Sequence, residues 1–181
     1  MSSLCQKIER AVRSWIRMVA QDNSTLLLEL SDGTLAVTDE GLYIELTTGG
    51  SYTIPILIGE TEETMNPPCI IIVCSNAQQE EDKSPWWFCD LSVEVRVPQN
   101  SWTDGEDAQP DVVASIETIS QGIANVLFAD GFEDNLDDRE DELCVLGRAP
   151  GGTRQRTPQG RMRIHRYGMT LYAAEEHIDI N

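Results

Sequence analysis

The sequence predicts an α+β domain in which two amphipathic helices pack on one face of a mostly antiparallel sheet, with extra β-hairpins after the first helix. Two observations support this prediction. Apolar residues recur at helical spacing over residues 3–20 and 111–128. Along residues 86–97 they instead alternate strictly with polar residues, as in a half-buried strand. Further strands are predicted at residues 69–74, 143–146 and 161–173.

Length and composition are those of a globular protein. The chain has 181 residues, of which 40% are hydrophobic and 24% charged. We therefore expect a single domain over residues 1–181, with 25–60 as a β-hairpin elaboration and 174–181 as a flexible tail.

The first helix places a basic stripe opposite its apolar face. At 100° per residue this stripe contains Lys7, Arg10, Arg13 and Arg17. One interpretation is a solvated helix face. The other is a charged seam against a neighbouring copy, because the rest of the chain is strongly acidic.

Two hairpins are predicted next. Residues 26–30 and 34–37 flank a Ser-Asp-Gly turn, and residues 42–46 and 51–57 flank a Thr-Thr-Gly-Gly turn. They form either a small subdomain or one continuous meander, and the pattern leaves both open.

The middle of the chain predicts a central strand, a loop and a long strand. Residues 69–74 are apolar on both faces, as a central strand requires, and residues 75–85 are predicted as an exposed loop. In the strand that follows, Trp86 and Phe88 share the charged face. They are either contacts to a second layer or anchors of a protein interface.

The second helix begins at Pro110, a residue favoured in the first helical turn. One side is predicted to be buried and contains Val112, Ile116, Ile119, Ile123, Val126 and Leu127. The opposite side is small and almost uncharged, with Ser115, Thr118, Gln121, Gly122 and Asn125. Such a face permits close approach of another surface, or is simply exposed.

In the last third of the chain, acidic and basic residues lie in separate segments. An acid-rich segment at 130–142 precedes a Gly/Pro/Arg loop predicted at 147–160. Opposite patches on one subunit suit a head-to-tail ring, whereas internal pairing is the alternative. The apolar phase of the last strand changes near Gly168, which predicts a β-bulge there.

Charge and motif content exclude several function classes. A net charge of −18 argues against nucleic-acid binding and suits a surface that DNA passes without sticking, or simply a soluble acidic protein. The two histidines are isolated, and the acidic run lacks calcium-loop spacing. The five cysteines lack a Cys-x-x-Cys motif and are interpreted as structural thiols rather than metal or redox groups. We therefore expect no enzyme, no metal and no cofactor.

The order of these elements resembles that of tail-terminator (tail-completion) proteins of tailed bacteriophages. The resemblance rests on the proline-led strand, the acidic loop, the Trp-headed strand, the Ile-rich helix and the two closing strands. It covers the first helix and residues 67–175 but not 25–60. It implies a structural virion protein whose homo-hexameric ring ends the tail tube and joins it to the head. Neck and head–tail joining adaptor proteins share the fold and are the alternative.

The resemblance also implies partners and a location. These partners are further copies of the chain, the tail tube protein and the head–neck connector or stopper protein; whether a sheath protein joins them is left open. DNA would pass through without specific binding, and no membrane is expected, because no apolar run approaches the length of a span. Such a protein is assembled in the host cytoplasm and resides at the tail–neck junction of the virion.

Basic residues are the candidate contacts to neighbouring subunits or the tube. They are Lys7, Arg10, Arg13, Arg17, Arg148, Arg154, Arg156 and Arg161. The loops at 75–85, 130–142 and 147–160 are candidates to become ordered on docking. Two other hypotheses are a monomeric adaptor that binds one partner and a cytosolic enzyme with a dispersed site.

Overall fold

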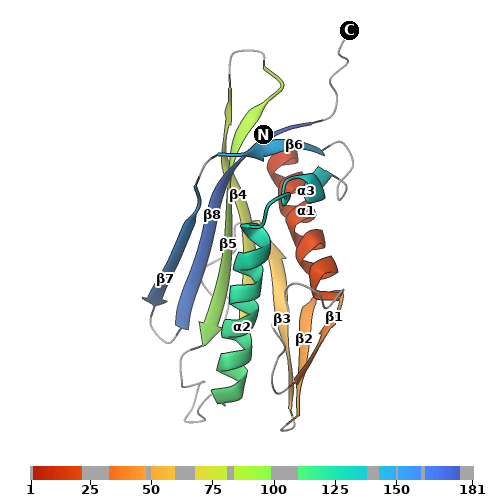
Figure 1. The fold of residues 1–181 in the computed structure, drawn as a ribbon, viewed down its shortest axis with the longest axis vertical. Coiled ribbons are helices and arrows are strands. Elements are labelled where there is room, and N and C mark those ends of the chain that lie inside the picture. Colours follow the sequence, from red (N-terminus) through yellow and green to blue (C-terminus); the bar gives the residue numbers. More distant parts are fainter. Residues whose placement is uncertain are drawn as a thin grey trace.

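A computed structural model describes residues 2–21, 33–47, 50–59, 68–80, 84–98, 110–137, 143–149, 151–159 and 162–175. Within these residues the chain forms three helices and an eight-stranded, mostly antiparallel sheet that curls along its length (Figure 1). The predicted α+β class is therefore confirmed.

The elements run from helix to sheet and back. The helices are α1 (Ser2–Gln21), α2 (Pro110–Leu127) and the short α3 (Asp134–Asp137). The strands are β1 (Gly33–Val37), β2 (Gly41–Leu46), β3 (Ser51–Ile58), β4 (Cys69–Gln79), β5 (Trp87–Pro98), β6 (Leu143–Arg148), β7 (Thr153–Gln159) and β8 (Met162–Glu175). In the sheet their order is β1-β2-β3-β4-β5-β8-β6, and β7 also pairs with β8.

The centre of the sheet is the antiparallel pair β5 and β8. Its register runs without interruption from Trp87 opposite Ala173 to Pro98 opposite Met162. The alternation predicted for this strand is confirmed, because every second side chain of β5 is buried: Cys89, Leu91, Val93, Val95 and Val97.

The strands β1, β2 and β3 form one continuous antiparallel meander. It joins the main sheet through a parallel pairing of β3 with β4, in which Ile56 lies opposite Ile70. The pairing of β1 with β2 links the second predicted hairpin to the last strand of the first. Most of the first predicted hairpin, residues 26–32, lies outside the described residues.

Two predicted loops are partly strands. The loop expected at 75–85 begins later, since β4 continues to Gln79 past a register shift between Ser75 and Gln78. The loop expected at 147–160 contains β7, which pairs with β8 from Thr153 to Gln159. Most residues of both segments are polar, and backbone pairing with a neighbouring strand does not require apolar side chains.

The bulge predicted near Gly168 is wrong. Gly168 lies directly opposite Ser92 in an unbroken register with β5. The apolar phase changes because Ile164 and Tyr167, an odd number of positions apart, are buried on opposite faces of the sheet.

The helices cover the face of the sheet that carries the buried β5 side chains (Figure 1). The buried side of α1, which includes Ile8, Val12 and Ile16, packs on β4 and on the meander. The short α3 falls within the acid-rich segment and packs against α1 and β6.

The second helix packs on β5 through a stripe that is wider than predicted. Gln121 and Asn125 are exposed, as expected, and Nε2 of Gln121 donates a hydrogen bond of 2.9 Å to Oδ1 of Asn125. Ser115 and Gly122 were expected on the exposed side but are buried. The second helix is therefore covered over more than the stripe that its apolar residues define.

Candidate functional site

The basic stripe of α1 borders a surface hollow beside the edge strand β1. Arg10, Arg13 and Arg17 line this hollow of about 510 Å³, together with neutral residues that include Val37. The Arg17 guanidinium donates a hydrogen bond of 2.9 Å to the Thr38 carbonyl, which joins α1 to the connection between β1 and β2. Lys7, the fourth predicted residue, is half-buried and does not line the hollow.

Arg148, by contrast, is used inside the subunit. Its Nε lies 2.9 Å from Oε1 of Glu133, and its guanidinium donates to the carbonyls of Leu127 and Ala129 at 3.0 and 3.1 Å. The Leu127 carbonyl is the last of α2 and that of Ala129 lies in the turn after it; at a helix end carbonyls lack helical partners and a cation is favourable. The acidic and basic segments thus pair internally at this point.

Of the remaining predicted arginines, Arg154 and Arg156 lie on the edge strand β7. Arg154 is exposed, and its guanidinium carbon lies 4.6 Å from the centre of the Phe128 ring. Arg156 is also exposed, and its Nη2 donates to Oε1 of Glu117 at 3.1 Å. Arg161 lies outside the described residues.

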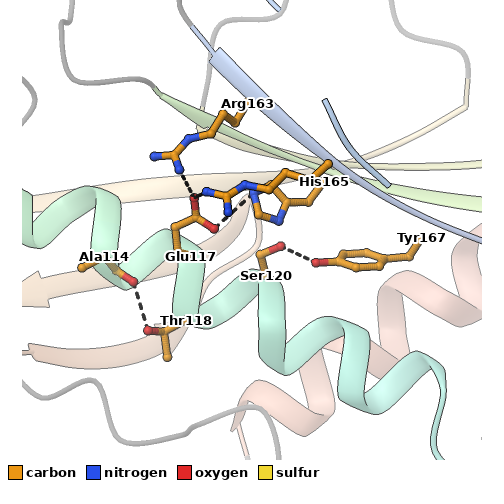
Figure 2. Close-up of polar contacts among 8 residues, drawn as sticks. Ala114, Glu117, Thr118, Ser120, Arg163, His165 and Tyr167 are labelled. Atoms are coloured by element: carbon orange, nitrogen blue, oxygen red, sulfur yellow. Dashed lines mark hydrogen bonds and ion pairs between the residues drawn. The ribbon is translucent and has the colours of Figure 1, made fainter. Parts of the chain in front are cut away.

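Glu117 joins α2 to the sheet through a cluster of cationic side chains (Figure 2). Besides Arg156, Nη1 of Arg163 lies 3.0 Å from Oε1. Nε2 of His165 lies 3.1 Å from Oε2, although this contact lacks hydrogen-bond geometry. One carboxylate thus holds residues of β7 and β8 beneath the helix.

One turn further along α2, a second polar contact is fully inside the protein. The hydroxyls of Ser120 and Tyr167 are 2.6 Å apart, and both residues are buried (Figure 2). Burial raises the pKa of Tyr167, so its hydroxyl stays protonated at neutral pH. Burial also lowers the pKa of His165, an effect that Glu117 opposes and that Arg156 and Arg163 reinforce.

Sequence reasoning missed Glu117. Two features of the sequence indicate this residue. After Asp111, Glu117 is the one charged residue of α2, and Arg163, His165 and Tyr167 occur at every second position of one strand. A single acidic residue on an apolar helix and basic residues on one face of a strand have opposite charges and can therefore pair. Their meeting, however, depends on the packing of the helix over the strand.

The other face of the sheet carries an aromatic cluster near the turn between β4 and β5. Tyr172 lies directly opposite Phe88, and their ring centres are 5.0 Å apart. Trp86 stacks on Tyr172 at 5.4 Å. Phe88 remains 40% exposed, and the Tyr172 hydroxyl donates to the Glu80 carboxylate. The expectation that Trp86 and Phe88 either contact a second layer or anchor a protein interface stays a prediction.

A hollow of about 480 Å³ lies on this same face, beside the β6–β7 connection. In it the Thr170 hydroxyl donates to Oδ1 of Asp90 at 2.7 Å. The two residues are directly opposite each other on β8 and β5, so the register alone accounts for the contact. Arg166, also in the hollow, is paired with Glu94. These contacts stabilise neighbouring strands and are not the arrangement of an activated nucleophile.

No protein-family profile matches the chain, and a search of curated proteins finds no significant match. In the part of the chain that the structure describes, none of the helices combines the length and apolarity needed to cross a lipid bilayer.

Proposed function

We propose that this protein is a structural subunit of a bacteriophage tail that assembles into a ring, ends the tail tube and joins it to the head. The observation that carries the proposal is the basic hollow of Arg10, Arg13 and Arg17 on a chain whose net charge is −18. A concave cationic surface on so acidic a protein is complementary to other copies of the protein itself.

A ring requires two different surfaces on each subunit, because a head-to-tail contact joins unlike patches. The acid-rich segment supplies the second kind of surface. Asp130, just before α3, and Asp134, its first residue, are exposed, whereas Glu133 is already paired with Arg148. We propose that the hollow of one subunit receives this acidic turn of the next.

The fold is compatible with the proposal. Its mixed α+β architecture with a mostly antiparallel sheet is the architecture that the resemblance implies, and we assign the meander β1–β3 as an elaboration of it. The face of the sheet opposite the buried β5 side chains bears the Trp86, Phe88 and Tyr172 cluster, an aromatic surface of the kind that anchors protein interfaces. We assign it to contact with the tube or the connector. The excess negative charge would line a channel that repels the DNA passing through it.

The assembly test compares a charge reversal with a matched addition of charge. Wild-type protein should form rings, alone or with tail tube protein, that mass photometry and negative-stain electron microscopy detect. Arg13→Glu should prevent ring formation, and adding Asp134→Lys should restore it. Thr34→Glu, on an exposed position of β1 outside the hollow, is the control and should leave assembly intact.

Two outcomes would decide against the ring. Unchanged assembly in Arg13→Glu would show that the hollow is not a subunit contact. A wild-type protein that stays monomeric and binds the connector, but not the tube, would favour the neck or head–tail joining adaptor instead.

A further inference from the structure

Three of the five cysteines meet in space although they are far apart in the sequence. Cys5 lies in the first turns of α1, Cys74 on β4 and Cys89 on β5. Their Sγ atoms all lie within 4.8 Å of one another. Cys74 and Cys89 are buried, and Cys5 is half-buried at the edge of the cluster. The two remaining cysteines, Cys69 and Cys144, are not part of it.

The fold brings these thiols together through two neighbouring strands and the helix above them. Cys74 lies opposite Leu91 in the β4–β5 pairing, and Cys89 is two residues before Leu91, so both cysteines face the same side. That side is the one on which α1 packs. Cys5, on α1, therefore lies close to the cysteines of both strands.

A buried glutamate fixes the position of this cluster. Glu9 is one helical turn after Cys5 and is only 5% exposed. Its Oε1 accepts a hydrogen bond of 2.9 Å from the backbone N–H of Cys74. A carboxylate enclosed in this way is costly unless it is held by such contacts, and here it ties the helix to the strand that carries the second thiol.

The spacing suits a tetrahedral metal ion. Zinc–sulfur bonds of about 2.3 Å place the sulfur atoms of a tetrahedral site about 3.8 Å apart. Rotation of the side chains by a small amount would bring the three atoms to that distance. A disulfide joins only two sulfur atoms at about 2.05 Å and would leave the third without a role. Thiolate ligands also select zinc over hard cations such as magnesium.

We propose that Cys5, Cys74 and Cys89 bind one Zn²⁺ ion as three thiolates and so fasten α1 to β4 and β5. The three thiol protons are released to solvent as the ion binds, and a water molecule takes the fourth position from the half-exposed side at Cys5. Glu9 is a positioning residue, since it holds the backbone of Cys74 rather than the ion.

The test titrates the full-length, reduced protein with Zn²⁺ and, as a spectroscopic probe, with Co²⁺. We expect one ion per chain, a thiolate-to-cobalt charge-transfer band and a higher unfolding temperature with Zn²⁺. Cys5→Ser, at the half-buried position, should weaken binding at least about 100-fold while the fold is retained by circular dichroism. The matched control Cys144→Ser should bind like the wild type.

Three results would overturn the proposal. They are the absence of the charge-transfer band, equal affinity in Cys5→Ser and wild type, and a mass lower by two hydrogens in anaerobically purified protein, which would indicate a disulfide. Proton release measured in weakly buffered solution separates thiolate binding from adventitious binding by carboxylates. None of these readouts depends on ring assembly.

Discussion

The carboxylate of Glu117 on α2 lies 3.0 Å from the guanidinium of Arg163 on β8. Both side chains are 26% exposed, so the pair is partly shielded from water and stronger than a surface ion pair. The same carboxylate contacts Arg156 and His165, so one residue of the helix fixes its position over two strands.

Loss of the Glu117 charge should therefore destabilise the fold. We expect Glu117→Ala to lower the free energy of unfolding by about 1–2 kcal/mol, because the cations are left without their shared partner. Urea denaturation measures the change. Gln121→Ala, at an exposed position one turn away, is the control and should change stability by less than about 0.5 kcal/mol. Equal effects of the two substitutions would contradict the role of Glu117.

Stability should also depend on His165 protonation. Burial lowers the pKa of His165 below its ordinary value of 6.5, so the unfolded chain binds a proton at a higher pH than the folded protein. This residue therefore contributes a loss of stability as the pH falls below about 6.5. His165→Gln should remove that contribution from the pH profile of thermal unfolding, and His177→Gln should leave it. A profile unchanged by His165→Gln would contradict the expectation.

Substitutions of Arg148 and Arg154 should distinguish an arginine that stabilises the fold from one that lies on the surface. Arg148→Ala removes the cation that binds the last carbonyls of α2, and we expect a loss of about 1–2 kcal/mol in the free energy of unfolding. Arg154→Ala removes an exposed cation over Phe128 and should cost no more than about 1 kcal/mol. Chemical denaturation of the two variants side by side is the measurement, and a reversed order would show that the assignment of Arg148 is incorrect.

Gly41 should tolerate no side chain. A Cβ atom there would lie 2.1 Å from the carbonyl oxygen of Ile54 on the neighbouring strand, and backbone cannot move aside as a flexible side chain does. We expect Gly41→Ala to cost about 2–3 kcal/mol by forcing β2 and β3 apart. Gly147→Ala, where a Cβ would meet nothing within 4 Å, is the matched control. Comparable thermal stability of both variants would contradict the close approach.

Helices and strands could be predicted from the sequence where buried and exposed side chains recur at regular spacing. The α1 stripe and the alternation of β5 follow directly from residue spacing, since each element must bury one face. The edge strand β7 and the end of β4 were expected to be loops. Most of their residues are polar, so their local pattern does not indicate that a neighbouring strand pairs with them.

The sequence by itself determined the α+β class, the helical and alternating periods and the charge of −18, because these depend on neighbours along the chain. The tertiary structure decided that Glu117 lies over Arg163 and that Cys5, Cys74 and Cys89 meet. It also decided that Arg148 is bound internally while Arg13 lines a hollow. Such contacts depend on how a helix is placed over strands distant in sequence, and the spacing of residues along one element carries no information about that placement.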